Sequence, residues 1–308
     1  MSKNNPLVSI MIPVFNRQDY VGEAITSVLR QTYQNFELIV HDDASTDASL
    51  AVIKSFHDPR LRIIHTSKNH GMLGGWNYLL QKGQGKYIKQ MGSDDLLAPD
   101  CIARELAILE QYPGVSLVTC QRQVIGRAGE HLFTYQFGQH SQLVSGTEHA
   151  HWILTNLREN KIGEPCAVLF RRSLVGLPRR SEAKAGLFDP QFSQFADFEY
   201  WIRLLQFGDL YYLHTPLVYF RQHPDSNTSA AISDGRFITE IFALIVKYYK
   251  DPFFVKTFSL TSADQAQVTR QKTLDTLKNI KDLLLNGHFL MASRYTTKLI
   301  GAMVKSHQ

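Results

Sequence analysis

The stretch LVSIMIPV at residues 7–14 decides the fold of this 308-residue chain. An almost continuous apolar run of this length is typical of a strand that is buried on both faces of a sheet. Apolar residues at helical spacing follow over residues 21–29, and FELIV at residues 36–40 makes a second buried strand. The chain therefore begins with the alternation of strands and helices that is typical of α/β proteins.

The alternation continues further along the chain. Apolar runs predict strands at residues 61–65, 86–91 and 115–120 and another near residues 167–170, with helical patterns between them. We expect a doubly wound, mostly parallel central sheet flanked by helices, with ligands bound beyond the carboxyl ends of its strands. No G-x-G-x-x-G or P-loop segment occurs, so the sequence gives no support to a nicotinamide or P-loop site.

Polar residues follow three of these strands where the strands end. They are Asn16 and Arg17, Asp42 and Asp43, and Asp94 and Asp95. Two adjacent carboxylates at such an edge can hold a hard divalent cation, and the cation can bind a diphosphate. The structural alternative is that the aspartates only end a strand and begin the next helix, where Asp is common. Their coincidence at three strand ends favours a ligand site.

The bulk composition is that of a soluble globular protein, with 44% hydrophobic and 20% charged residues. No apolar run approaches the roughly 18 residues that span a bilayer, and residues 1–6 lead into a strand without a secretory segment. The three cysteines, Cys101, Cys120 and Cys166, have neither CxxC nor metal-binding spacing, which favours a reducing compartment. We therefore expect a cytoplasmic protein.

Positive charge is concentrated in the C-terminal part of the chain. Residues 235–308 hold 11 Lys and Arg against 5 Asp and Glu, a net charge of +6, so the total of +5 leaves −1 for the rest. We expect amphipathic helices at residues 273–285 and 293–305. An apolar stripe with one lysine consists of Leu274, Leu277, Ile280, Lys281 and Leu284. Such a stripe can lie on a membrane, pack on the rest of the chain or join a second copy, and the charge can equally belong to a solvated face.

Several segments resemble, in their order and spacing, the landmarks of glycosyltransferase family 2. They are IPVFNR at 12–17, VHDDASTD at 40–47, NHG at 69–71, Asn77, GSDD at 92–95, GLFD at 186–189, ADFEYWIRL at 196–204 and YFRQH at 219–223. The resemblance covers residues 7–229. It implies the GT-A fold, with a Rossmann-like and mostly parallel central sheet, and inverting transfer of a sugar from a nucleoside diphosphate donor.

The resemblance also implies a division of the chain. Residues 1–234 would form the GT-A domain, with a nucleotide-sugar-binding half at 1–122 and an acceptor-binding half at 123–234. Residues 235–308 would add a basic helical extension outside the resemblance. The partners would be the donor, with UDP as the first choice, and a glycan or lipid-linked acceptor in cell-surface polysaccharide synthesis, with no role for nucleic acid. The extension would contact the inner face of the cell membrane peripherally or form a homo-oligomer.

The same resemblance assigns the donor-binding residues. They are Pro13, Phe15, Asn16, Asp42, Asn69, Asn77, Gly92, Ser93, Asp94, Asp95 and Arg221. Asp42 would accept a hydrogen bond from the nucleotide base, although it can also simply end its strand. Asn77 could equally cap a helix. Asp95 would orient the site or cap the helix that follows.

Two further roles follow from the matched positions. Asp94 and His223 would hold a divalent metal, manganese or magnesium, which prefers oxygen donors and keeps several waters. Asp197 would be the general base that takes the proton of the acceptor hydroxyl. Its expected place at the start of a helix suits an ionised carboxylate, and it could also cap that helix.

The sequence departs from the family pattern at two positions. Gly92 and Ala196 stand where the family often has acidic residues. Because the chain has fewer acidic residues at these positions than the family often has, an alternative function is a nucleotide-sugar-binding scaffold subunit without turnover. A nucleotidyltransferase ranks last, because it should have a glycine-rich basic loop near the first strand. No motif encodes the sugar, the nucleoside, the acceptor or the linkage.

An arginine cluster adds one more hypothesis. Arg171, Arg172, Arg179 and Arg180 could meet an anionic acceptor such as a lipid diphosphate, or could form a solvated loop.

Overall fold

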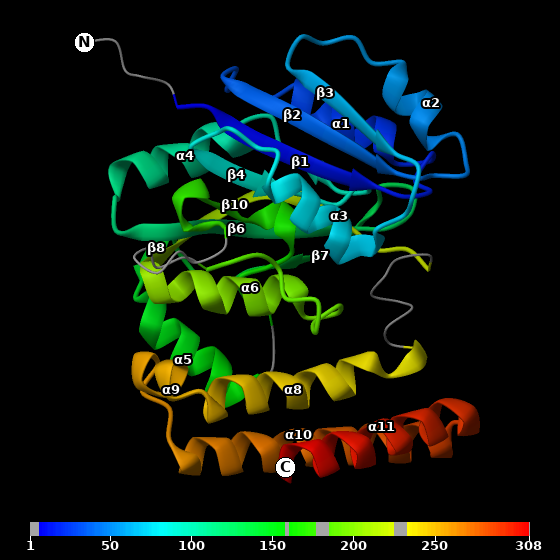
Figure 1. The fold of residues 1–308 in the computed structure, drawn as a ribbon, viewed down its shortest axis with the longest axis vertical. Helices are drawn as coiled ribbons and strands as arrows, with labels where there is room; N and C mark the ends of the chain where they lie inside the picture. The colour runs from blue at the N-terminus through cyan, green and yellow to red at the C-terminus, as the bar shows by residue number, and fades with distance from the viewer. Residues whose placement is uncertain (1–5, 158–159, 177–184, 225–232, 308) are drawn as a thin grey trace.

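The computed structural model describes residues 6–157, 160–176, 185–224 and 233–307. One ten-stranded sheet crosses the molecule, helices cover both of its faces, and a layer of C-terminal helices lies at the end opposite to β3 and α2 (Figure 1). The strands are β1 (Val8–Val14), β2 (Phe36–Asp43), β3 (Leu61–Thr66), β4 (Tyr87–Gln90), β5 (Leu96–Leu97), β6 (Val115–Ile125), β7 (His131–Tyr135), β8 (Gln142–Val144), β9 (Leu169–Arg171) and β10 (Asp209–Arg221).

The helices connect these strands in the predicted alternation and then form the C-terminal layer. They are α1 (Val21–Leu29), α2 (Ser49–Lys54), α3 (Gly71–Leu80), α4 (Cys101–Gln111), α5 (Gly146–Asn156), α6 (Ala196–Leu204), α8 (Arg236–Lys250), α9 (Pro252–Thr257), α10 (Ser262–Leu285) and α11 (Phe289–His307). Short 3-10 turns lie at Pro165–Ala167, Arg172–Leu174 and Leu205–Phe207. The predicted α/β class with a helical extension is confirmed.

The strand order is β3-β2-β1-β4-β9-β6-β10-β5. The first four strands pair in parallel, as the apolar runs predict, and β6 also pairs in parallel with β10. The short strands differ, because β9 pairs antiparallel with both β4 and β6, and β5, β7 and β8 pair antiparallel at their edges. The side of the sheet formed by β3, β2, β1 and β4 is therefore parallel, and the other side is mixed.

Alternation along β1 explains why both faces of the sheet are covered. Val8, Ile10 and Ile12 pack with α1 and α4 in one core, whereas Met11 belongs to the other core, with α3, α5, α6 and α8. All four side chains are fully buried. Burial of one such side chain contributes roughly 1.5–3 kcal/mol, so this strand anchors both helical layers.

A buried ion pair lies below the loop that carries Asp94. Lys89 of β4 donates to both carboxylate oxygens of Glu105 in α4, at 2.8 and 2.7 Å, and both side chains have no exposed surface. A charge this deep is stable only when it is paired. The pair therefore fixes α4 against the strand that leads into Gly92.

The C-terminal helices do not all pack as the sequence pattern predicts. Helix α8 packs with one apolar side into the core that contains α5 and α6, and α10 and α11 pack on each other and on α8. Ile280 is buried, whereas Leu274, Leu277 and Leu284 are about half exposed, so the single predicted stripe is divided between two sides of α10. No helix in the described part of the chain is both long enough and apolar enough to cross a bilayer.

Candidate active site

A cavity of about 580 Å³ opens beyond the carboxyl ends of β1, β2 and β4. The predicted site residues that line it are Pro13, Phe15, Asn69, Gly92, Ser93, Asp94, Asp95, Asp197 and Arg221. Asp94 and Asp197 are more than one hundred residues apart in sequence and share this one cavity. The cavity lies where ligands bind in open α/β sheets, and its volume suits a nucleotide-sugar.

Asp94 lies next to an imidazole. Its Oδ2 is 2.9 Å from Nε2 of His223 and 3.9 Å from Nε of Arg17. His223 follows β10, is buried behind the cavity wall, and has its ring 4.8 Å from the ring of Tyr20. One carboxylate oxygen and one imidazole nitrogen can both serve as ligands of a divalent cation, so these two residues fit a metal at the predicted position.

Asp95 lies deeper than Asp94. Its Oδ1 accepts a hydrogen bond from the backbone N–H of Arg221 at 3.1 Å. Burial, and then the neighbouring charge of Asp94, raise the pKa of Asp95 well above its usual range. The backbone N–H of Ile102 in the first turn of α4 donates to Oε1 of Gln31 at 3.1 Å, so this turn is capped by Gln31 and the alternative of a helix-capping role for Asp95 is wrong. Asp95 instead joins the Gly92–Asp95 loop to β10.

Arg221 holds three segments together. Its guanidinium donates to the backbone oxygens of Asp94 and Arg127, both at 2.9 Å, and to Oε2 of Glu23 at 2.6 Å. It also lies over the ring of Tyr20, 5.2 Å from the ring centre. The side chain lines the cavity, but its donors serve these partners, so its main role is to fix the carboxylate loop.

Gly92 is required by the packing of the two aspartates. A Cβ at this position would lie 2.6 Å from Oδ1 of Asp94 and 2.8 Å from Oδ2 of Asp95. A side chain here would push both carboxylates out of place. The missing acidic residue is therefore a consequence of how this loop packs.

Gly92→Ala is expected to lower kcat/KM for the reaction in this cavity by about tenfold or more, because a displacement near 1 Å at a reacting centre is costly. The melting temperature should change little, since the atoms that must move are the ends of two side chains. Steady-state kinetics and thermal unfolding measure the two effects. Gly114→Ala is the matched control, because a Cβ there meets nothing within 4 Å. Equal activity of both variants would contradict the packing argument.

Asp43, and not Asp42, faces the cavity. Successive side chains of a strand point to opposite faces, and the structure places Asp43 in the cavity wall. Asp42 is fully buried, with its Oδ2 2.9 Å from Nδ1 of His65. The prediction that Asp42 reads the nucleotide base therefore disagrees with the structure, because Asp43 and not Asp42 lies in the cavity wall.

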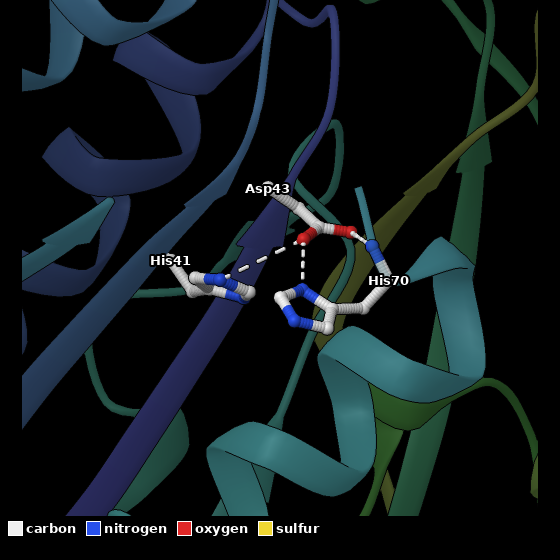
Figure 2. A group of neighbouring side chains, drawn as sticks. All are labelled: His41, Asp43 and His70. Atoms are coloured by element: carbon white, nitrogen blue, oxygen red, sulfur yellow. Dashed lines mark hydrogen bonds and ion pairs between the residues drawn. The ribbon is translucent and has the colours of Figure 1, made fainter. Parts of the chain in front are cut away.

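Two histidines surround Asp43 (Figure 2). His70 donates its backbone N–H to Oδ2 of Asp43 at 2.8 Å, and its Nδ1 lies 2.7 Å from Oδ1. Nε2 of His41 is 3.8 Å from the same Oδ1, and burial lowers the pKa of His41 so that it is neutral near pH 7. Within the described ranges, this group of three is a second place where side chains could hold a metal ion.

Asn16 and Asn77 support the wall without lining the cavity. Oδ1 of Asn16 accepts a hydrogen bond from the backbone N–H of Thr46 at 2.8 Å, and Asn16 has a positive φ of 52°. Asn77 bonds both the N–H and the carbonyl of Phe188, at 2.8 and 2.9 Å. The prediction of a direct nucleotide contact is replaced, for both, by a positioning role.

Asp197 lies half-buried at the N-terminus of α6. Its Oδ1 accepts from the backbone N–H of Phe198 at 2.8 Å, and Nδ2 of Asn160 is 3.4 Å from Oδ2. Burial, followed by the negative charge of Glu164, raises the pKa of Asp197 to about 7. A carboxylate with this pKa is well matched to accept a proton near neutral pH.

Glu164 is a cavity residue that the sequence analysis missed. It lines the cavity with Asp197, and its Oε2 is 3.0 Å from Nε of Arg122 in β6. No motif marks it, since it precedes a short 3-10 turn in a segment without regular pattern. The charge of Glu164 acts on Asp197, so it tunes the predicted base.

The arginine cluster is structural where it is described. Arg171 donates to the backbone oxygens of Val115 and Leu109, at 2.7 and 2.8 Å, and Arg172 donates to that of Gly85 at 2.7 Å. These bonds tie strand ends together, so the idea that the pair binds an anionic acceptor is not supported. Arg179 and Arg180 lie outside the described residues.

Residues 9–175, which are more than half of the chain, match the family model described as Glycosyl transferase family 2. The chain belongs to glycosyltransferase family 2. An uncharacterised glycosyltransferase of Rickettsia typhi is 30% identical over 74% of this family 2 chain and 68% of the relative. The Escherichia coli protein named as a putative colanic acid biosynthesis glycosyl transferase, WcaA, is 40% identical over 35% of this chain and 40% of its own.

Solved structures show the same GT-A fold. S. aureus TarS 1–349, in complex with UDP-GlcNAc, superposes with a TM-score of 0.58 and 15% identity, covering 97% of this chain and 92% of its own. The mannosyltransferase PcManGT from Pyrobaculum calidifontis, in complex with GDP-Man and Mn²⁺, has a TM-score of 0.55 and 19% identity, with coverage of 98% and 87%. The similarity to both neighbours extends beyond the part matched by the family model, so it includes the C-terminal helices.

Proposed function

We propose that this family 2 member is an inverting glycosyltransferase that transfers a hexosyl or N-acetylhexosaminyl group from a nucleoside diphosphate-sugar to a hydroxyl group. UDP is the first choice of nucleoside, and the acceptor is a glycan or lipid-linked saccharide in cell-surface polysaccharide synthesis. The main support is that Asp94 and Asp197 line one cavity of about 580 Å³. The UDP-GlcNAc complex of TarS and the name of WcaA agree with this proposal.

The donor half of the cavity supplies groups for the nucleotide. The ring of Phe15 is 45% exposed and lines the cavity, so it can stack on the base. Asp43, held by His70, can accept an N–H of the base. Asp94 and His223 would hold the manganese or magnesium ion, which when bound supplies positive charge for the diphosphate.

The acceptor half performs the proton transfer. Asp197 takes the proton of the acceptor hydroxyl while the acceptor oxygen forms a bond to the anomeric carbon and the bond from that carbon to the diphosphate breaks. The nucleoside diphosphate leaves with the bond electrons. Because one base serves one displacement from the face opposite to the leaving group, the product has the inverted configuration. Glu164 keeps the pKa of Asp197 high enough for efficient proton transfer.

Asp94→Asn is expected to abolish the extra thermal stabilisation that Mn²⁺ gives in the presence of UDP. Bound ligand stabilises the folded state by RT ln(1 + [L]/Kd), so the loss of a metal ligand appears directly as a smaller shift. Thermal unfolding with UDP, GDP, dTDP and CDP, each with and without Mn²⁺, measures this effect and identifies the nucleoside.

His70→Ala is the control for the second metal-binding group. It should keep the Mn²⁺-dependent increment, even if the UDP shift itself is smaller. If His70→Ala removes the increment and Asp94→Asn keeps it, the ion lies at His41, Asp43 and His70, and the assignment to Asp94 is wrong.

The alternative of a binding subunit without turnover loses part of its motivation. Gly92 is explained by the packing of Asp94 and Asp95, and only Ala196, which also lines the cavity, still departs from the family pattern. Tight calorimetric binding of UDP, with no product from any acceptor pool, would favour this alternative.

A further inference from the structure

Helices α10 and α11, joined by residues 286–288, form a helical hairpin at one end of the molecule. In Figure 1 this hairpin is the layer farthest from β3 and α2. Its inner side is used for packing. The buried apolar side chains there are Val268, Ile280, Ala292, Tyr295, Leu299 and Ala302. The hairpin is therefore held to the body of the protein by one side only.

The outer side of the hairpin is apolar and exposed. Among the described residues, sixteen large apolar side chains are exposed, and nine of them lie on this hairpin. We call these nine side chains the hairpin face. They are Leu274, Leu277, Leu284, Leu285, Phe289, Leu290, Ile300, Met303 and Val304. Leu285, Phe289 and Leu290 are the most exposed, at 74%, 67% and 69%. An apolar concentration of this kind marks an interaction surface.

The charge of the hairpin narrows the choice of partner. Residues 262–307 contain seven Lys and Arg and three Asp. Asp264 is used in the N-terminal capping box of α10, and Asp275 lies 3.4 Å from Nζ of Lys272. No acidic residue follows Asp282, whereas Arg294, Lys298 and Lys305 do. The end of α10 and all of α11 therefore combine apolar side chains with positive charge alone.

We propose that the hairpin face binds the surface of a bilayer that contains anionic lipids, with α10 and α11 lying in the plane of the interface. Leucine and phenylalanine enter the boundary of the acyl chains, and lysine and arginine meet the headgroups, as in amphipathic interfacial helices. A second copy is a poorer partner, because each copy would bring seven cations and only three carboxylates to pair with them. The proposal does not depend on the donor site.

Flotation of the full chain with vesicles tests the proposal. The chain should float with vesicles of phosphatidylcholine and phosphatidylglycerol, float much less with phosphatidylcholine alone, and lose binding as salt screens the charges. The double variant Leu285→Ser, Leu290→Ser should reduce the bound fraction about tenfold. Both side chains are largely exposed, so the fold and the UDP-induced thermal shift should be unchanged.

The matched control is Leu132→Ser, Leu143→Ser, which changes two half-exposed leucines on β7 and β8 away from the hairpin. It should float like the original chain. Failure of the original chain to bind anionic vesicles, or an equal loss in the control, would overturn the proposal. A dimer in sedimentation that the Leu285→Ser, Leu290→Ser variant dissociates, without vesicle binding, would replace the lipid by a second copy.

Discussion

Asp197→Asn is expected to reduce the rate of sugar transfer by about 10²–10⁴-fold, the usual contribution of a positioned general base. Asparagine keeps the shape of the side chain but cannot take the proton of the acceptor hydroxyl. The donor half of the cavity is untouched, so the UDP-induced thermal shift should be preserved. Single-turnover transfer and UDP titration separate the two effects. Asp100→Asn, at an aspartate before α4 whose side chain is 42% exposed, is the control and should stay fully active.

The pH dependence gives the same assignment a second test. Because the pKa of Asp197 is about 7 in the folded chain, kcat/KM should rise with pH through about 7, where the base becomes ionised. The raised pKa means that the folded state binds this proton more tightly than the unfolded state. The proton on Asp197 therefore raises the free energy of unfolding at low pH, and this contribution is lost as the pH rises from about 4 to 7.

Asp197→Asn should therefore also make the protein more stable above pH 7 and change its stability little at pH 4. Thermal unfolding at the two pH values measures this. An active variant, or one with no gain in stability at high pH, would remove Asp197 as the base in a desolvated site.

Lys89→Met is expected to lower the free energy of unfolding by about 3–5 kcal/mol, because it leaves the carboxylate of Glu105 buried without its partner. Neither side chain has exposed surface, so water cannot replace the lost ammonium group. The double variant Lys89→Met, Glu105→Leu should recover most of the loss, since it removes both charges. Chemical denaturation of the three proteins gives the coupling between the two residues.

Lys86→Met is the matched control for this experiment. Lys86 is only three residues away and pairs with Glu110 at 2.7 Å, but its side chain is 56% exposed. Removal of this exposed ion pair should lower the free energy of unfolding by about 0–1 kcal/mol. A similar cost at both positions, or a double variant no better than Lys89→Met, would show that the buried pair is not the source of the stability.

The parallel part of the fold could be predicted because its signal is local. Strands β1 and β2 are buried apolar runs, β3 is a partly buried strand with three apolar residues, and their helices have clear apolar spacing. Strands β5, β7 and β8 have between two and five residues, which is too short for a periodic pattern, and the mixed part of the sheet remained undefined. The position of β9 between β4 and β6 depends on long-range pairing that no local pattern contains.

Prediction of the site from the sequence was limited for the same reason. The carboxylates at strand ends were found because parallel strands bring their ends together, and Asp94 and Asp197 do share a cavity. To decide whether Asp42 or Asp43 faces the cavity, one must know to which side of the sheet each side chain points. Two adjacent aspartates in a sequence do not give this information. Asn77 bonds a backbone 111 residues away, and Glu164 has no pattern around it. Such contacts depend on the completed tertiary structure.

The bonds of Arg221 have a consequence for chimaeric enzymes. A side chain at the end of β10 fixes the Asp94 backbone, residue 127 and a glutamate of the first helix. An exchange of residues 1–122 alone between relatives would separate Asp94 and Glu23 from the arginine that fixes them. A successful exchange has to carry the segment around residue 221 as well, although it is almost one hundred positions further along the chain.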